Sequence, residues 1–145
     1  AKSPHNFLGI NQQGQVSVFK TKGNTHGHII LRGGNGQPNY HAANIARVET
    51  KLKEAKVSPA IVIDCSHGNS NKDYKLQGAV FENVIQQIVD GNNSIVGMML
   101  ESHLSEGNQP IPSNLEDLKY GVSVTDQCIN WQETEEIILG AYEKL

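Results

Sequence analysis

The sequence predicts an α/β protein built on a parallel β-sheet. Three continuous apolar runs of strand length lie within residues 28–34, 59–67 and 94–104. Two stretches with apolar residues at close to helical spacing, 39–57 and 73–93, separate these runs. Strands that alternate with helices are typical of parallel βα units. We therefore expect strand, helix, strand, helix and strand in that order, then a loop and a last helix over residues 133–145.

The strand-like runs are continuous rather than alternating, which is typical of strands buried on both faces. Before them, residues 1–28 contain short β-prone segments separated by Gly/Asn turns, the pattern of a β-hairpin. An open sheet of only three buried strands would leave long apolar edges. We therefore interpret residues 1–145 as a single partial domain, a piece of a larger α/β sheet or barrel.

Composition restricts the class of partner. The 145 residues carry a formal charge of -3, with 37% hydrophobic and 19% charged residues, which is a globular composition. A basic stripe is absent, so we expect no nucleic-acid partner. An apolar run of about 18 residues is also absent, so we expect no membrane-spanning helix. Two cysteines do not make a disulfide framework, and with no signal peptide at the start we expect a cytoplasmic protein.

Polar side chains follow each predicted strand. They are Arg32 after the first strand, Asp64, Ser66 and His67 after the second, and Glu101 and His103 after the third. In parallel α/β proteins, ligands bind at the carboxyl ends of the strands, where the loops converge. The sequence therefore predicts a functional site at this edge of the sheet.

Arg32 and His67 each allow two interpretations. Arg32 is a planar, permanently charged donor suited to phosphate or carboxylate, and the adjacent Gly33 and Gly34 would let a ligand approach the backbone. The alternative is a turn arginine that caps a helix C-terminus or pairs with a carboxylate. His67 can bind a metal or transfer protons near neutral pH. A hydrogen-bonded loop histidine is the alternative.

Two carboxylates complete a candidate ligand set. Glu101 closes a largely apolar strand, where a carboxylate must be paired or hold a metal. Asp126, taken alone, would be a helix N-cap or a solvated turn residue. With His67 they form a set that suits Mn, Fe or Zn. Cys65 adjoins this set, but we interpret it as a buried core thiol.

Six segments resemble one family in the same order. They are "PHNFLG", "GHIILRGG", "PNY", "DCSHGNSNKD", "ESHLSEGNQP" and "YGVSVTD", followed by further matches to residue 131. Together they resemble the type I 3-deoxy-D-arabino-heptulosonate 7-phosphate (DAHP) synthases, over essentially the whole chain. The resemblance implies the C-terminal part of a (β/α)8 TIM barrel with a short β-hairpin extension near the N-terminus.

The resemblance also implies a reaction and a site. The family condenses phosphoenolpyruvate with erythrose 4-phosphate, the first step of the shikimate pathway of aromatic amino acid biosynthesis. It uses a divalent metal such as Mn, Fe, Co or Zn. His67, Glu101 and Asp126 match the family's metal ligands. Arg32 matches an arginine that holds the phosphate of phosphoenolpyruvate.

Regulation is implied by the N-terminal segment. Phe7 and Gly9 match the strand where the family binds its feedback inhibitor, tyrosine or phenylalanine. Gly9 stands where phenylalanine-sensitive members have serine, which makes the chain more similar to the tyrosine-sensitive class.

Exposed strand edges would favour self-association, so we expect a homo-oligomer.

Two parts of the family pattern have no match in the chain. These are an early cysteine that is the fourth metal ligand and a Lys-Pro-Arg-Thr motif that supplies a catalytic lysine. We therefore assign no catalytic residue and expect a C-terminal fragment that is inactive alone. Two alternatives remain open: a metal-dependent aldolase or hydrolase of another barrel family, and a non-catalytic module that binds an amino acid.

Overall fold

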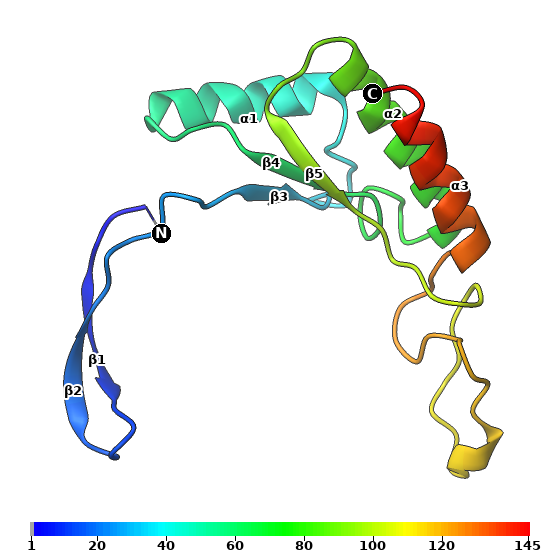
Figure 1. The fold of residues 1–145 in the computed structure, drawn as a ribbon, viewed down its shortest axis with the longest axis horizontal. Coiled ribbons are helices and arrows are strands. Elements are labelled where there is room, and N and C mark those ends of the chain that lie inside the picture. The colour runs from blue at the N-terminus through cyan, green and yellow to red at the C-terminus, as the bar shows by residue number, and fades with distance from the viewer. Residues whose placement is uncertain (1) are drawn as a thin grey trace.

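The computed structural model describes residues 2–145 and confirms the α/β class (Figure 1). Its elements, in chain order, are β1 (Asn6–Ile10), β2 (Val16–Lys20), β3 (Ile29–Leu31), α1 (Ala42–Glu54), β4 (Ile61–Asp64), the 3₁₀ helix η1 (Tyr74–Leu76), α2 (Gln77–Val89), β5 (Ile95–Met99), the 3₁₀ helix η2 (Leu115–Asp117) and α3 (Trp131–Tyr142). Among the described residues, no helix is both long and apolar enough to cross a membrane.

The main sheet is parallel and has the strand order β3-β4-β5. Leu31 pairs with Ile63, and Ile63 pairs with Met98 on the other side. The helices α1 and α2 connect successive strands, as in the predicted βα units (Figure 1). The carboxyl ends of all three strands therefore lie at one edge of the sheet.

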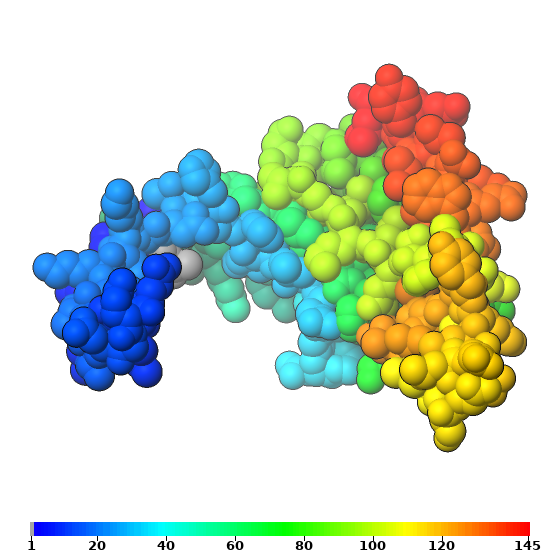
Figure 2. Space-filling model, turned by 60° about the horizontal axis from the view of Figure 1, so that its bottom comes forward, coloured from blue at the N-terminus to red at the C-terminus, as the bar shows by residue number. Residues whose placement is uncertain are grey.

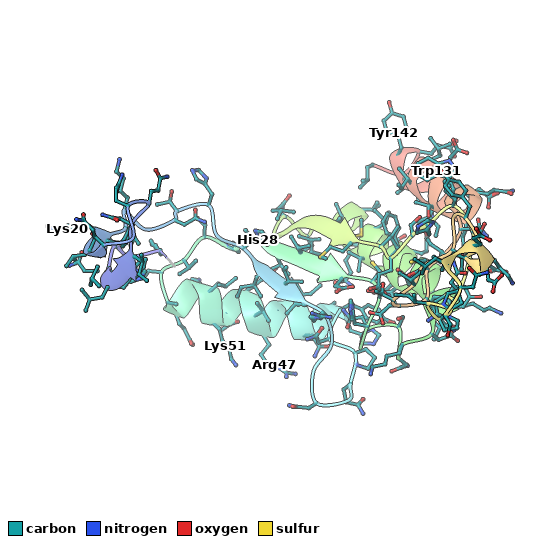
Figure 3. All side chains as sticks on the ribbon, turned by 90° about the horizontal axis from the view of Figure 1, so that it is seen from below. Lys20, His28, Arg47, Lys51, Trp131 and Tyr142 are labelled. Atoms are coloured by element: carbon teal, nitrogen blue, oxygen red, sulfur yellow. The ribbon has the colours of Figure 1, made fainter. Side chains whose placement is uncertain are left out.

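The hydrophobic core lies between the sheet and its helices. The fully buried positions of β4 are Ile61 and Ile63, each 0% exposed, and α2 contributes Val84 to the same cluster. Helix α1 buries Ile45 and Leu52. Its opposite face is polar: Figure 3 shows Arg47 and Lys51 pointing away from the sheet. Each connecting helix therefore buries one apolar face.

The prediction that all three strands are buried on both faces is wrong. Only β4, the central strand, is close to that description, whereas Ile30 of β3 is 44% exposed and Val96 of β5 is 60% exposed. Both are on outer strands of this three-stranded sheet. Alternate residues of a strand point to opposite faces, and the helices cover one face of the sheet. The continuous apolar runs therefore predicted the strands but overestimated their burial.

The last helix begins at Trp131, before the predicted start at residue 133. The side chain of Asn130 accepts a hydrogen bond from the backbone N–H of Glu133 at 2.8 Å, so Asn130 is the N-cap. The cap precedes the apolar periodicity, so the periodicity predicts a later start for the helix. The first and last residues of α3, Trp131 and Tyr142, are 56% and 82% exposed (Figure 3).

The N-terminal segment forms the expected antiparallel hairpin. Phe7 pairs with Phe19 and Leu8 with Val18. Figures 1 and 2 show this hairpin as a separate lobe that stands away from the sheet, while the loop before α3 extends on the opposite side. The Nζ of Lys2 donates a hydrogen bond to the carbonyl of Lys56 at 2.7 Å, beside the base of the hairpin.

Candidate metal centre

His67 follows β4 through a short, buried polar segment. Asp64 and Ser66 are each 2% exposed, and His67 then adopts a left-handed backbone conformation with φ 51°. Such a conformation is uncommon for residues other than glycine and costs of order 1 kcal/mol. A backbone hydrogen bond of 2.7 Å from the N–H of Lys72 to the carbonyl of His67 closes the turn. The strand end therefore directs the imidazole out of the sheet edge.

Two glycines bring the first two strand ends into contact. Gly33 has φ 81°, and a Cβ atom on it would lie 2.6 Å from the Cα of Gly68. The N–H of Gly68 donates a hydrogen bond of 3.1 Å to the carbonyl of Arg32. The sequence predicted that a ligand approaches the backbone at Gly33. The backbone of the neighbouring loop occupies it instead, whereas Gly34 has open space around it.

Glu101 is held by a buried amide on helix α2. Gln77 is 0% exposed. Its Nε2 donates to the carbonyl of Glu101 at 3.1 Å, and its Oε1 accepts from the N–H of Glu101 at 2.8 Å. Paired hydrogen bonds of this kind satisfy both buried polar groups and fix the backbone just beyond β5. The side chain of Glu101 therefore extends from a fixed backbone position.

Asp126 comes from the long loop before α3. Gly107 and Cys128 exchange backbone hydrogen bonds of 2.8 and 3.1 Å, and the N–H of Ile129 donates to the carbonyl of Glu101 at 3.0 Å. These bonds fold the loop back toward the end of β5. The side chain of Asp126 is 71% exposed and lies opposite His67.

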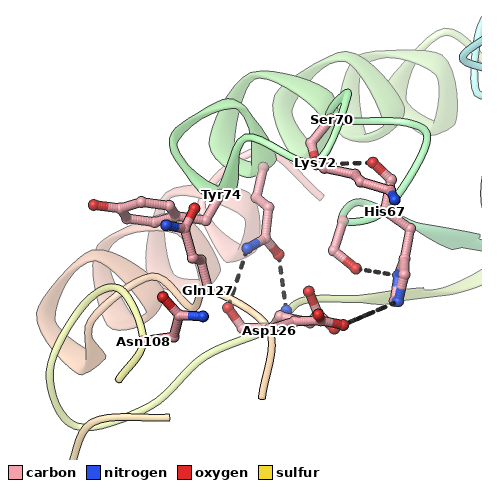
Figure 4. A pocket seen from close by; sticks show the side chains of 10 residues that line it. His67, Ser70, Lys72, Tyr74, Asn108, Asp126 and Gln127 are labelled. Carbon is pink, nitrogen blue, oxygen red and sulfur yellow. Dashed lines mark hydrogen bonds and ion pairs between the residues drawn. The ribbon is translucent and has the colours of Figure 1, made fainter. Parts of the chain in front are cut away.

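The structure brings His67, Glu101 and Asp126 together (Figure 4). The Nε2 of His67 is 3.6 Å from Glu101 Oε1 and 3.8 Å from Asp126 Oδ2. One ligand atom from each residue lies within 4.8 Å of the other two. Ligand atoms bound at about 2.0–2.2 Å to one ion are themselves about 3–4 Å apart. The imidazole nitrogen and two carboxylates are donors that fit Mn, Fe, Co or Zn.

A cavity of about 290 Å³ opens beside these three residues. Its other walls include Ser70, Lys72, Tyr74 and Asn108, and every lining residue has a polar or charged group on its side chain (Figure 4). Sequence reasoning did not select these four residues. A small polar ligand could lie in this cavity against the candidate metal centre.

The two thiols do not join the ligand set. Burial, and secondarily the charge of Asp64, raises the pKa of the Cys65 thiol to about 12. Burial also raises the pKa of Cys128. A metal-binding cysteine must lose its proton. Both cysteines are free and buried, and the interpretation of Cys65 as a core thiol is confirmed.

The remaining predicted site residues lie outside the cavity. Arg32 is beside the centre, with its Nε 3.9 Å from Asp64 Oδ2 and its side chain 57% exposed. Phe7 and Gly9 are on the hairpin, away from the sheet edge (Figure 1). The rings of Phe7 and Phe19 stack with centroids 5.5 Å apart. A Cβ on Gly9 would lie 2.9 Å from the ring of Phe19, so a side chain there would shift that ring.

Sequence reasoning missed two residues that organise the centre. Gln77 holds Glu101, as described above. Asn69 donates to the carbonyls of Leu31 and Asp64 at 3.0 and 2.8 Å, and it joins the ends of β3 and β4. Asn69 lies in the polar run after His67, which was the only available signal. Nothing in the helical pattern distinguished Gln77 from a solvated glutamine.

Fold and site together define an α/β protein with a candidate divalent-metal centre at the carboxyl edge of its parallel sheet. The sequence pattern described as the DAHP synthetase I family matches residues 1–139. The chain is 51% identical over 145 residues to a protein of Salmonella typhimurium named "Phospho-2-dehydro-3-deoxyheptonate aldolase, Tyr-sensitive". Its identity to the corresponding Tyr-sensitive protein of Escherichia coli is 50%.

A solved structure gives the same result. The phospho-2-dehydro-3-deoxyheptonate aldolase of Francisella tularensis superposes with a TM-score of 0.91 at 42% identity, over 99% of this chain and 41% of that protein. The chain therefore belongs to the DAHP synthetase I family, as the resemblance implied. It spans 40% of the length of the Salmonella and Escherichia relatives.

Proposed function

We propose that this chain is part of a DAHP synthase, which condenses phosphoenolpyruvate with erythrose 4-phosphate at the entry to aromatic amino acid biosynthesis. The observation that carries the proposal is the convergence of His67, Glu101 and Asp126 at one edge of the sheet. Family membership supports the reaction. We further propose that β3, β4 and β5 belong to a (β/α)8 barrel and that residues 1–145 form part of one domain.

The proposed roles follow from the chemistry of the side chains. His67, Glu101 and Asp126 would hold a divalent metal, which when bound supplies Lewis-acid activation of the aldehyde of erythrose 4-phosphate. Arg32 would hold the phosphate of phosphoenolpyruvate through charge-assisted hydrogen bonds. Carbon 3 of phosphoenolpyruvate then attacks the aldehyde carbon, water adds at carbon 2, and phosphate leaves. The chain contains no Lys-Pro-Arg-Thr motif, so we propose that it does not turn over alone.

Replacing Arg32 by alanine is expected to weaken phosphoenolpyruvate binding by about 10- to 100-fold, because a hydrogen bond to a charged group is worth roughly 1.5–3 kcal/mol. Titration calorimetry with the Mn²⁺-loaded chain measures this loss. Arg47→Ala is the matched control, since Arg47 is exposed on the outer face of α1.

Three results, from this calorimetry, from a phosphate-release assay and from ligand-binding measurements, would count against these proposals. Equal affinity in the Arg32→Ala and Arg47→Ala chains would remove Arg32 from the substrate site. Sustained phosphate release by the 145-residue chain would contradict its inactivity. Binding of tyrosine with no binding of Mn²⁺ or phosphoenolpyruvate would favour the amino-acid-binding alternative over the enzyme.

We also propose that an aromatic amino acid, tyrosine or phenylalanine, binds near Phe7 and Gly9 and inhibits the complete enzyme. The names of the Tyr-sensitive relatives support this role. Phe7 is 48% exposed, so an aromatic ring is available on the hairpin. The two free, buried thiols support a reducing compartment such as the cytoplasm.

A homo-oligomer is the proposed assembly, and one face of the hairpin supports it. Leu8, Ile10, Val16 and Val18 pair across the two strands, and each is at least 60% exposed. Such a patch favours association. Leu8→Lys is expected to lower the average mass in sedimentation equilibrium, whereas Leu115→Lys, at a similarly exposed position of η2, leaves it unchanged. A monomeric unsubstituted chain would contradict the proposal.

A further inference from the structure

We propose that Asp64 is a positioning residue for the metal centre: its buried carboxylate accepts the Nδ1 proton of His67 and so directs the Nε2 lone pair toward Glu101 and Asp126. This inference rests on the proposed metal-dependent function. Asp64 is 2% exposed and is not among the three candidate ligands. Both of its carboxylate oxygens nevertheless lie near hydrogen-bond donors.

The hydrogen bonds around Asp64 determine where the imidazole proton lies. Asp64 Oδ1 accepts from the N–H of Ser66 at 2.9 Å and from its Oγ at 2.6 Å. Asp64 Oδ2 is 2.9 Å from the Nδ1 of His67. An ionised carboxylate only accepts hydrogen bonds. The ring nitrogen that faces Asp64 must therefore carry a proton.

Ser66 leads to the same assignment. Its Oγ is 2.6 Å from His67 Nδ1 as well as 2.6 Å from Asp64 Oδ1. A hydroxyl has one proton, and the carboxylate can only accept it. The oxygen of Ser66 is then left as an acceptor toward Nδ1. Both neighbours of that nitrogen are acceptors, so the neutral ring has the Nδ1–H tautomer.

The opposite ring nitrogen is then unprotonated and faces the ligand carboxylates. Nε2 lies 3.6 Å from Glu101 Oε1 and 3.8 Å from Asp126 Oδ2. Only a nitrogen with a free lone pair can bind a metal. Partners behind a ligating histidine fix its tautomer, and their loss typically weakens metal affinity by about 10- to 100-fold.

Asp64 also connects the metal centre to the proposed phosphate contact. Its Oδ2, the oxygen that faces His67, is 3.9 Å from the Nε of Arg32. One buried carboxylate thus lies between a metal ligand and the arginine assigned to phosphate. Removal of its charge is expected to disturb the orientation of both side chains.

The test is the tautomer of His67 in the metal-free chain, read from the ¹⁵N chemical shifts of its ring at a pH where the ring is neutral. A His67→Gln chain identifies the resonances. We expect the Nδ1–H tautomer in the unsubstituted chain. In Asp64→Asn, whose amide can donate to Nδ1, we expect the Nε2–H tautomer and Mn²⁺ affinity about 10- to 100-fold weaker by equilibrium dialysis.

Two further variants make the result specific. Asp117→Asn, on the exposed η2 turn, is the matched control and should change neither reading. Ser66→Ala should keep the Nδ1–H tautomer. An Nε2–H tautomer in the unsubstituted chain would overturn the proposal, and so would a tautomer that changes in Ser66→Ala but not in Asp64→Asn. If Asp64→Asn does not fold by circular dichroism, the readings on the unsubstituted and Ser66→Ala chains decide.

The tautomer is measured without metal or substrate. A chain that shows the Nδ1–H form yet binds no phosphoenolpyruvate would contradict the proposed function and leave the role of Asp64 in orienting His67 intact. A chain that has the Nε2–H tautomer without metal and yet binds Mn²⁺ and phosphoenolpyruvate would support the proposed function and contradict the role of Asp64.

Discussion

Replacing Glu101 by alanine is expected to abolish saturable Mn²⁺ binding by the chain. Among the residues that the structure describes, Glu101 supplies one of the three ligand groups that converge at the sheet edge, and the two remaining groups do not hold the ion against water. The loss should exceed the roughly 100-fold effect of changing a residue behind a ligand. Equilibrium dialysis of Mn²⁺ against both chains measures it directly.

Glu135→Ala provides the matched control for this experiment. Glu135 is exposed on α3, so its removal subtracts the same charge from the chain without touching the centre. Saturable Mn²⁺ binding by the control chain and none by Glu101→Ala would mean that the candidate metal centre assembles within residues 1–145. Equal binding by the two variants would contradict the assignment of Glu101 as a ligand.

Replacing Ile63 by alanine is expected to lower the free energy of unfolding by about 2–5 kcal/mol, because it removes buried methyl groups and leaves a cavity. Ile63 is 0% exposed in the central strand β4, between β3 and β5. Whole domains are stabilised by only about 5–15 kcal/mol, so a large share of the stability is at risk. Urea denaturation followed by circular dichroism gives the difference.

Ile111→Ala is the same chemical change at a position that is 64% exposed in the loop before α3. We expect it to cost no more than about 0.5 kcal/mol, as surface substitutions usually do. Similar losses for the two variants would show that β4 is not the centre of the core.

The alternation of apolar runs and helical patterns was enough to predict β3, β4, β5 and the two helices between them. The same runs misrepresented the environment of Ile30 and Val96, because an apolar composition identifies a strand without revealing what covers each face. The start of α3 was placed late for a related reason. A cap such as Asn130 acts through its side chain before the apolar periodicity begins.

The candidate site was predicted in part. His67 and Glu101 follow strands, so the general rule for parallel sheets placed them together. Asp126, taken alone, was interpreted as an N-cap or a turn residue, and its match to the family's metal ligand came from the resemblance. Its loop folds back only through bonds such as that between Ile129 and Glu101. Gln77 could not be predicted. Gln77 acts through hydrogen bonds to Glu101, which is distant in the sequence. No local sequence pattern predicts such bonds.

The separate hairpin has a consequence for how the chain responds to thermal fluctuation. β1 and β2 bond mainly to each other, and an isolated two-stranded ribbon is marginally stable in water. We therefore expect the hairpin and the rest of the chain to behave as two cooperative units with different opening free energies. Amide hydrogen exchange is expected to occur through local opening in the hairpin and through global unfolding in β4. An unfolding curve measured on the body reports nothing about the unit that carries Phe7 and Gly9.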